Sequence, residues 1–141
     1  MIAYFDTSAI IPLIINEAST GLCTRVWNES ARIVSVRLLY AEARAALARA
    51  ERIGRLTRQQ LMAAVAELDS VVNEVDHIEV SAQLAYAAGE LAQSHGLRGY
   101  DAVHLAAAIA VADRDLVLVT GDASLAAAAA AVGLSVSNTH A

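Results

Sequence analysis

Four acidic residues stand where short apolar runs end or where helical segments begin: Asp6, Glu42, Asp101 and Asp122. Oxygen ligands of this kind suit Mg²⁺ or Mn²⁺, whereas Zn²⁺ prefers histidine and cysteine. Ions held by carboxylates lower the pKa of a bound water and stabilise charge on the attacking and leaving oxygens of a phosphodiester. If the four acids meet in space, the sequence predicts metal-assisted hydrolysis of a phosphodiester.

The acids are carried by short apolar runs that alternate with helical segments. Strands are expected at Ile2–Phe5, Ile33–Val36, Ile78–Val80, Leu116–Thr120 and Leu134–Ser137. Helices are expected at about Thr7–Ile15, Ser19–Ser30, Leu38–Ile53, Arg58–Val75, Ser81–His95, Tyr100–Asp113 and Ala123–Val132. Strands that are apolar on both faces are typical of a parallel sheet covered by helices. The pattern predicts an α/β fold, a three-layer α/β/α sandwich with a mostly parallel central sheet.

The direction of these elements brings the acids to one rim. Asp6 directly follows the first strand, and Asp122 follows the fourth strand after Gly121. Ligands of such folds bind outside the carboxyl ends of the strands. Asp101 opens the helix that leads into Leu116–Thr120, and a helix that precedes a parallel strand begins at the same rim. Glu42 lies near the second turn of its helix, on a stripe shared with Leu38, Leu39, Ala45 and Ala46, which should face inward. We therefore expect the four acids to converge.

Each acid also has a simpler interpretation. Asp6 and Asp122 are suited to cap helices, and Asp101 to complement a helix dipole; for a single aspartate these roles are the commoner ones. Glu42 needs a partner on an apolar stripe, and Arg49 is the candidate, although it reaches back poorly. Four carboxylates on one rim would repel one another and raise their pKa values unless a cation compensates.

Two further residues near Asp101 bear on this choice. The nearest arginine in sequence is Arg98, and the chain contains no lysine. His104 follows Asp101 by one turn, and we interpret it as a helix-packing residue rather than a catalytic one.

Composition limits the remaining possibilities. A chain of 141 residues predicts a single domain spanning 1–141. The absence of lysine excludes a Walker A phosphate loop and Schiff-base chemistry. Cys23 is the only cysteine, which excludes an internal disulfide and fits a reducing cytoplasm. No secretory signal or membrane span is visible, so a soluble protein is expected. The hydrophobic fraction of 57% favours a homo-oligomer or a tightly bound partner.

The charge is unevenly distributed. The net charge of −5 argues against a general nucleic-acid coat, yet seven of the ten arginines fall between Arg32 and Arg58. Four of these are candidate phosphate contacts, although a solvated helix face is the commoner explanation: Arg44, Arg49, Arg52 and Arg55. The aromatic content of 4% offers few platforms on which unstacked bases of a nucleic acid could stack.

Four sequence blocks together resemble the signature blocks of PIN-domain ribonucleases: Asp6-Thr7-Ser8-Ala9, Tyr40-Ala41-Glu42, Tyr100-Asp101-Ala102-Val103-His104-Leu105-Ala106 and Thr120-Gly121-Asp122. Their order and spacing match over nearly the whole chain. The compact length is similar to that of the VapC toxins of type II toxin–antitoxin systems. The resemblance implies a single PIN domain and an endoribonuclease that depends on Mg²⁺ or Mn²⁺ and cuts structured RNA, such as tRNA or ribosomal RNA. It also implies a cytoplasmic homodimer that a VapB-type antitoxin inhibits.

By this resemblance Asp6, Glu42, Asp101 and Asp122 are the catalytic, metal-binding acids, with Ser8 and Thr120 in support. Two alternatives stay open. One is a PIN fold that serves only as a binding module. The other is an aspartate-dependent phosphatase, which would require a second acid at the position of Ser8 and normally a lysine.

Overall fold

The computed structural model describes residues 1–140, and a parallel sheet forms its centre. Its strands lie in the order β3-β2-β1-β4-β5. Their bounds are β1 (Ile2–Phe5), β2 (Arg32–Val36), β3 (Asp76–Ile78), β4 (Leu116–Thr120) and β5 (Ser135–Asn138). Every neighbouring pair is parallel, so the carboxyl ends of all five strands share one rim.

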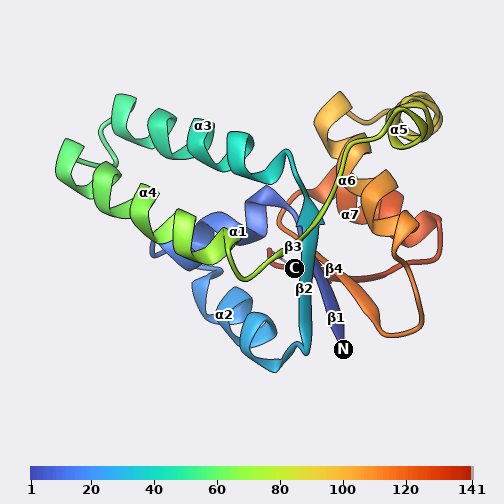
Figure 1. Cartoon of the computed structure of the whole chain (residues 1–141), viewed down its shortest axis with the longest axis horizontal. Helices are drawn as coiled ribbons and strands as arrows, with labels where there is room; N and C mark the ends of the chain where they lie inside the picture. The colour runs from blue at the N-terminus through green and yellow to red at the C-terminus, as the bar shows by residue number, and fades with distance from the viewer. Residues whose placement is uncertain (141) are drawn as a thin grey trace.

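Helices cover both faces of this sheet (Figure 1). One face packs against α1 (Thr7–Ile14), α2 (Thr20–Glu29), α3 (Leu39–Arg52) and α4 (Arg58–Val72), and the other against α5 (Ala82–His95), α6 (Gly99–Ala110) and α7 (Ala123–Ala131). A hydrophobic core lies on each face of the sheet, and the side chains of β1 alternate between them. Ala3 and Phe5 pack on the side of α1–α4, and Tyr4 packs on the side of α5–α7. The expected three-layer α/β/α sandwich is confirmed, and its sheet is parallel throughout.

Three elements differ from the sequence prediction by more than one residue. Helix α6 ends at Ala110 rather than Asp113. Helix α4 ends at Val72 rather than Val75, and β3 spans Asp76–Ile78 rather than Ile78–Val80. The strand was predicted from its apolar residues, so the pattern did not indicate a strand that begins with Asp76. In the fold Asp76 accepts a hydrogen bond from the Nε of Arg32 at 2.5 Å, which compensates its charge at the edge of the sheet. Pairing with β2 determines where β3 begins, and three residues separate it from the end of α4.

A glycine shapes the turn after β4. A Cβ atom at Gly121 would lie 2.8 Å from the Oγ1 of Thr139 and 2.9 Å from the ring of His140. The segment after β5 therefore packs directly on this turn, and the close approach requires glycine. In the part of the chain that the structure describes, no helix is both long and apolar enough to cross a membrane.

Candidate active site

The fold places the four predicted acids at the carboxyl rim, each on a different element. Asp6 follows β1 and caps α1, and Asp122 follows β4 and caps α7. Glu42 lies in the first turn of α3, and Asp101 in the first turn of α6. The capping interpretation of the two aspartates is thus correct, and it does not conflict with their position on the rim.

Asp6 is the most enclosed of the four, with 3% of its surface exposed. Its Oδ1 accepts hydrogen bonds from the Oγ of Ser8 at 2.6 Å and from the backbone N–H of Ala9 at 3.2 Å. Its Oδ2 accepts one from the Oγ1 of Thr120 at 2.6 Å. Burial raises the pKa of Asp6 above its usual value, although His104 and these hydrogen bonds counteract the rise.

Ser8 and Thr120 join the first motif to the last. The backbone N–H of Gly121 donates to the Oγ of Ser8 at 2.7 Å, and that of Asp122 donates to the Oγ1 of Thr120 at 3.0 Å. Both hydroxyls therefore accept from the turn after β4 while they donate to Asp6. The two supporting residues predicted from sequence fix the Asp6 carboxylate against this turn.

Glu42 is held by residues other than the predicted one. Its Oε1 accepts from the Oγ1 of Thr7 at 3.0 Å and lies 2.7 Å from the Nε2 of His104. The suggested pairing with Arg49 is wrong, because that residue lies two turns farther along α3 and is exposed at the outer end of the helix. The packing interpretation of His104 is incomplete, because the buried ring also contacts Glu42.

Asp101 and Asp122 share one arginine. The Nε of Arg98 donates to the Oδ2 of Asp101 at 3.0 Å, and its terminal nitrogen donates to the Oδ2 of Asp122 at 3.3 Å. The hydrogen bond to Asp101 and the charges of both aspartates raise the pKa of Arg98. The Arg98 side chain is 81% exposed, so this bridge lies on the surface and water screens it strongly.

The acids therefore form one neighbourhood but not one cluster. Among residues 1–140, no three Asp, Glu, His or Cys side chains are arranged as a ready-made metal site. Each carboxylate faces a protein partner: Asp6 the two hydroxyls, Glu42 His104 and Thr7, and the other two Arg98. The donor chemistry fits a hard divalent cation. Arg98 donates to the Oδ2 atoms of Asp101 and Asp122 and would compete with a cation for these two carboxylates.

Sequence reasoning missed the roles of Arg98 and His104. Arg98 stands three residues before Asp101, a spacing at which side chains meet on a helix surface, and this signal was available. For His104 the signal was its position one turn after an acid, on the face that packs inward. Its partner Glu42 is 62 residues away, and only the fold reveals that contact.

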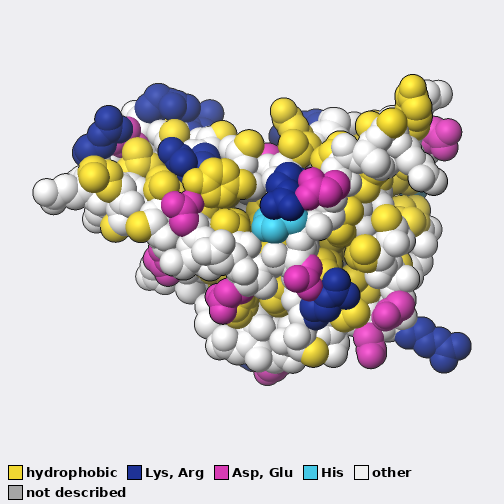
Figure 2. All heavy atoms as spheres, in the orientation of Figure 1, with side chains coloured by type: hydrophobic (Ala, Val, Ile, Leu, Met, Phe, Trp, Pro, Cys, Tyr) yellow, Lys and Arg dark blue, Asp and Glu magenta, His cyan; other side chains and the backbone are white. Residues whose placement is uncertain are grey.

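The four candidate phosphate contacts lie away from this neighbourhood. Arg44, Arg49 and Arg52 are exposed on α3, and Arg55 follows in the turn before α4. Figure 2 shows basic side chains gathered over the outer end of the α3–α4 hairpin. Arg44 lies over the ring of Tyr40, 5.7 Å from its centroid, and Arg55 lies 3.7 Å from Glu17. Exposure fits both phosphate binding and a solvated face.

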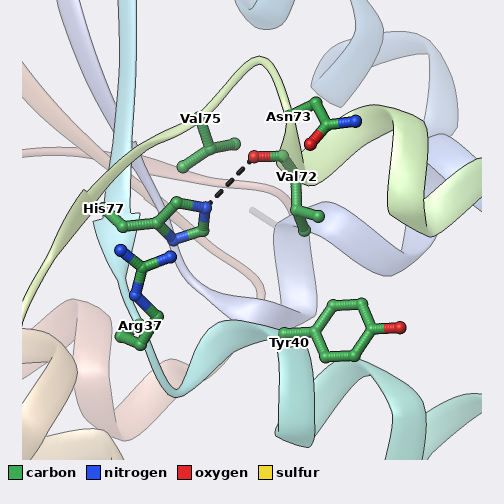
Figure 3. A pocket seen from close by; sticks show the side chains of 6 residues that line it. All are labelled: Arg37, Tyr40, Val72, Asn73, Val75 and His77. Carbon is green, nitrogen blue, oxygen red and sulfur yellow. Dashed lines mark hydrogen bonds between the residues drawn. The ribbon is translucent and has the colours of Figure 1, made fainter.

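A pocket of about 440 Å³ opens beside β3, at one edge of the sheet (Figure 3). Its lining residues are Arg37, Tyr40, Val72, Asn73, Val75 and His77. The Nε2 of His77 lies 3.1 Å from the carbonyl oxygen of Val72, and Arg37 is paired with Glu79. None of the four acids lines this pocket, so we place the candidate site at the acidic rim and not here.

Comparison with known proteins identifies a family, a relative in sequence and two solved structures of similar fold. The model of the PIN domain family matches residues 3–136. Ribonuclease VapC49 of Mycobacterium tuberculosis is 39% identical over 132 residues, covering 94% of this chain and 92% of that protein. Among solved structures, M. tuberculosis VapC20, described as a sarcin-ricin loop cleaving toxin, superposes with a TM-score of 0.70 at 20% identity, covering 94% of this chain and 95% of that one. VapBC2 from Rickettsia felis, bound to a promoter DNA fragment, gives 0.65 at 19% identity and 98% of each chain.

Proposed function

The chain belongs to the PIN-domain family and, within it, to the VapC ribonucleases, and from this premise we propose that it is an endoribonuclease dependent on Mg²⁺ or Mn²⁺. The observation that carries the proposal is the placement of four carboxylates, from four separate elements, at one rim of the sheet. One of them is buried, and burial raises its pKa, which indicates that its negative charge is incompletely compensated.

The proposed ligands are Asp6, Glu42, Asp101 and Asp122, and each has a distinct environment. When bound, a divalent cation supplies the positive charge that lowers the pKa of an attacking water and stabilises the leaving oxygen. The protein's own part is to hold the carboxylates. Ser8 and Thr120 orient Asp6 through hydrogen bonds of 2.6 Å, and the N-terminal turns of α3 and α6 carry Glu42 and Asp101 to the rim.

A circular RNA tests this proposal, because it has no ends and only an endonuclease opens it. We expect the purified protein to linearise such an RNA in Mn²⁺ or Mg²⁺ and to leave it intact in EDTA. Zn²⁺ should not substitute, because the proposed ligands are all oxygen atoms. RNA that stays circular with every cation would favour the alternative of a binding module, which the Arg98 bridge across two of the acids also fits. Opening in EDTA would contradict the metal requirement.

The substrate class we propose is structured RNA, such as tRNA or ribosomal RNA. Support comes from the low aromatic content of 4% and from the exposed arginines of the α3–α4 hairpin, which could contact phosphates along an RNA surface. VapC20, whose fold is similar, is a sarcin-ricin loop cleaving toxin. These features favour recognition of RNA shape.

The salt dependence of RNA binding tests the arginines. We expect the double variant Arg49→Gln, Arg52→Gln to flatten the slope of log K against log [salt] by about 0.7 to 0.9 for each lost phosphate contact. Arg25→Gln with Arg114→Gln is the matched control, since both residues are exposed arginines outside the hairpin. Binding is measured in the Asp6→Asn background to prevent cleavage. Equal slopes in both double variants would show that the hairpin arginines make no phosphate contacts and are only solvent-exposed side chains.

We also propose that the chain is a toxin that acts in the cytoplasm as a homodimer and pairs with a VapB-type antitoxin. The similarity of the fold to that of VapBC2 from Rickettsia felis supports the pairing with an antitoxin. The most exposed large apolar side chains include Ile53 and Met62 on the hairpin and Tyr86 and Tyr100 on α5 and α6. A dimer mass in solution, and a complex with the product of an adjacent small gene, would support these assignments. A monomer that does not bind that product would contradict them.

A further inference from the structure

His104 connects the two helical layers of the fold at the rim of the sheet. It belongs to α6, which packs on one face, while Glu42 belongs to α3, which packs on the other. Its Nε2 lies 2.7 Å from the Oε1 of Glu42, and its Nδ1 lies 2.8 Å from the hydroxyl oxygen of Tyr4 in β1. Only 2% of its surface is exposed. The buried ring of His104 therefore connects α6, which carries Asp101, to α3, which carries Glu42.

The hydrogen-bond pattern assigns a direction to this chain of contacts. A carboxylate can only accept, so the Nε2 that faces Glu42 carries the hydrogen. In the neutral ring Nδ1 is then an acceptor, and the Tyr4 hydroxyl supplies the donor. A tyrosine hydroxyl ordinarily keeps its proton at neutral pH, so it can donate here. Tyr4 thus donates to His104, and His104 donates to Glu42.

Both hydrogen bonds to the Glu42 carboxylate involve the same oxygen, Oε1. Within residues 1–140, the hydrogen bonds from Thr7 and His104 end on Oε1, and none ends on Oε2. A carboxylate pinned at one oxygen has a fixed plane, and its second oxygen has a fixed direction. The same histidine stands one turn after Asp101 on α6, so it also links the positions of two proposed ligands that come from opposite layers.

We infer that His104 is a positioning residue: it holds the Glu42 carboxylate so that Oε2 faces the cation, and it does not itself contact metal or RNA. The inference rests on the proposed function, because it gives the histidine a role toward that cation. Partners that orient a ligand in this way commonly change metal affinity by about 10- to 100-fold when removed.

Two amide substitutions of different reach provide the test. Glutamine at position 104 places an N–H where Nε2 lies and still donates to Glu42, whereas asparagine reaches only the position of Nδ1, near Tyr4. We expect His104→Gln to bind Mn²⁺ within about threefold of the parent protein and His104→Asn to bind about tenfold more weakly. The measurement is calorimetric titration with Mn²⁺ alone, without RNA, after thermal denaturation in EDTA has shown that each variant is folded.

A second background separates positioning from general damage to the fold. In Glu42→Gln, the orientation of an ionised Glu42 no longer matters, so His104→Asn should not weaken Mn²⁺ binding further. An equal loss in both backgrounds would overturn the inference, and so would equal affinities for the parent, Gln and Asn proteins. If the parent protein bound no Mn²⁺ at all, the proposed metal-dependent function would fall instead, so the two failures are distinguishable.

Discussion

Asp6→Asn should abolish RNA cleavage and at the same time stabilise the metal-free fold. Asparagine keeps an oxygen that accepts from the N–H of Ala9, so the cap of α1 survives. It removes the negative charge that the proposed site needs, and losing several kcal/mol of transition-state stabilisation lowers a rate by about 1000-fold or more. The measurement is the rate of RNA cleavage in Mn²⁺, with Asp115→Asn, an exposed acid at the opposite rim, as the control.

The stability change follows from the raised pKa of Asp6. Because the folded protein binds this proton more tightly than the unfolded chain does, the ionised carboxylate destabilises the fold at every pH above its folded pKa. The cost vanishes as the pH falls below the unfolded value near 3.8. In EDTA, Asp6→Asn should therefore melt at a higher temperature than the parent at pH 7, and the gap should close toward pH 3. A variant that cleaves at the parent rate would contradict the role of Asp6, and a lower melting temperature at pH 7 would contradict the buried charge.

Arg98→Gln should tighten the binding of Mn²⁺ by about three- to fivefold in the absence of RNA, the range that exposed ion pairs of up to about 1 kcal/mol allow. Arg98 donates to both Asp101 and Asp122, so it competes with a cation that binds these carboxylates. Glutamine removes the competing charge and keeps a polar side chain at a largely exposed position. Titration of the variant against Arg114→Gln, which alters an exposed arginine at the amino end of β4, checks that the effect is local. Unchanged or weaker binding would show that Arg98 does not compete with the cation.

The fold and the position of the acids at the rim could be predicted from sequence because they depend only on the order and direction of the strands and helices. Alternating strands and helices predict a parallel sheet, and its carboxyl ends fix where Asp6 and Asp122 lie. The partners of the acids could not be predicted in this way. Glu42 is paired with a histidine from the opposite layer, and this contact depends on how α3 and α6 approach the rim. The start of β3 was missed because the acid at that position is compensated by Arg32 from a neighbouring strand.

The central claim is that these carboxylates share one divalent cation, and anomalous diffraction from a crystal soaked in Mn²⁺ tests it most directly. The account predicts a strong peak in contact with oxygens of Asp6 and of at least two among Glu42, Asp101 and Asp122, with Arg98 turned away from its two aspartates. At saturating Mn²⁺, a map with no peak at this rim and Arg98 still bridging Asp101 and Asp122 would contradict it.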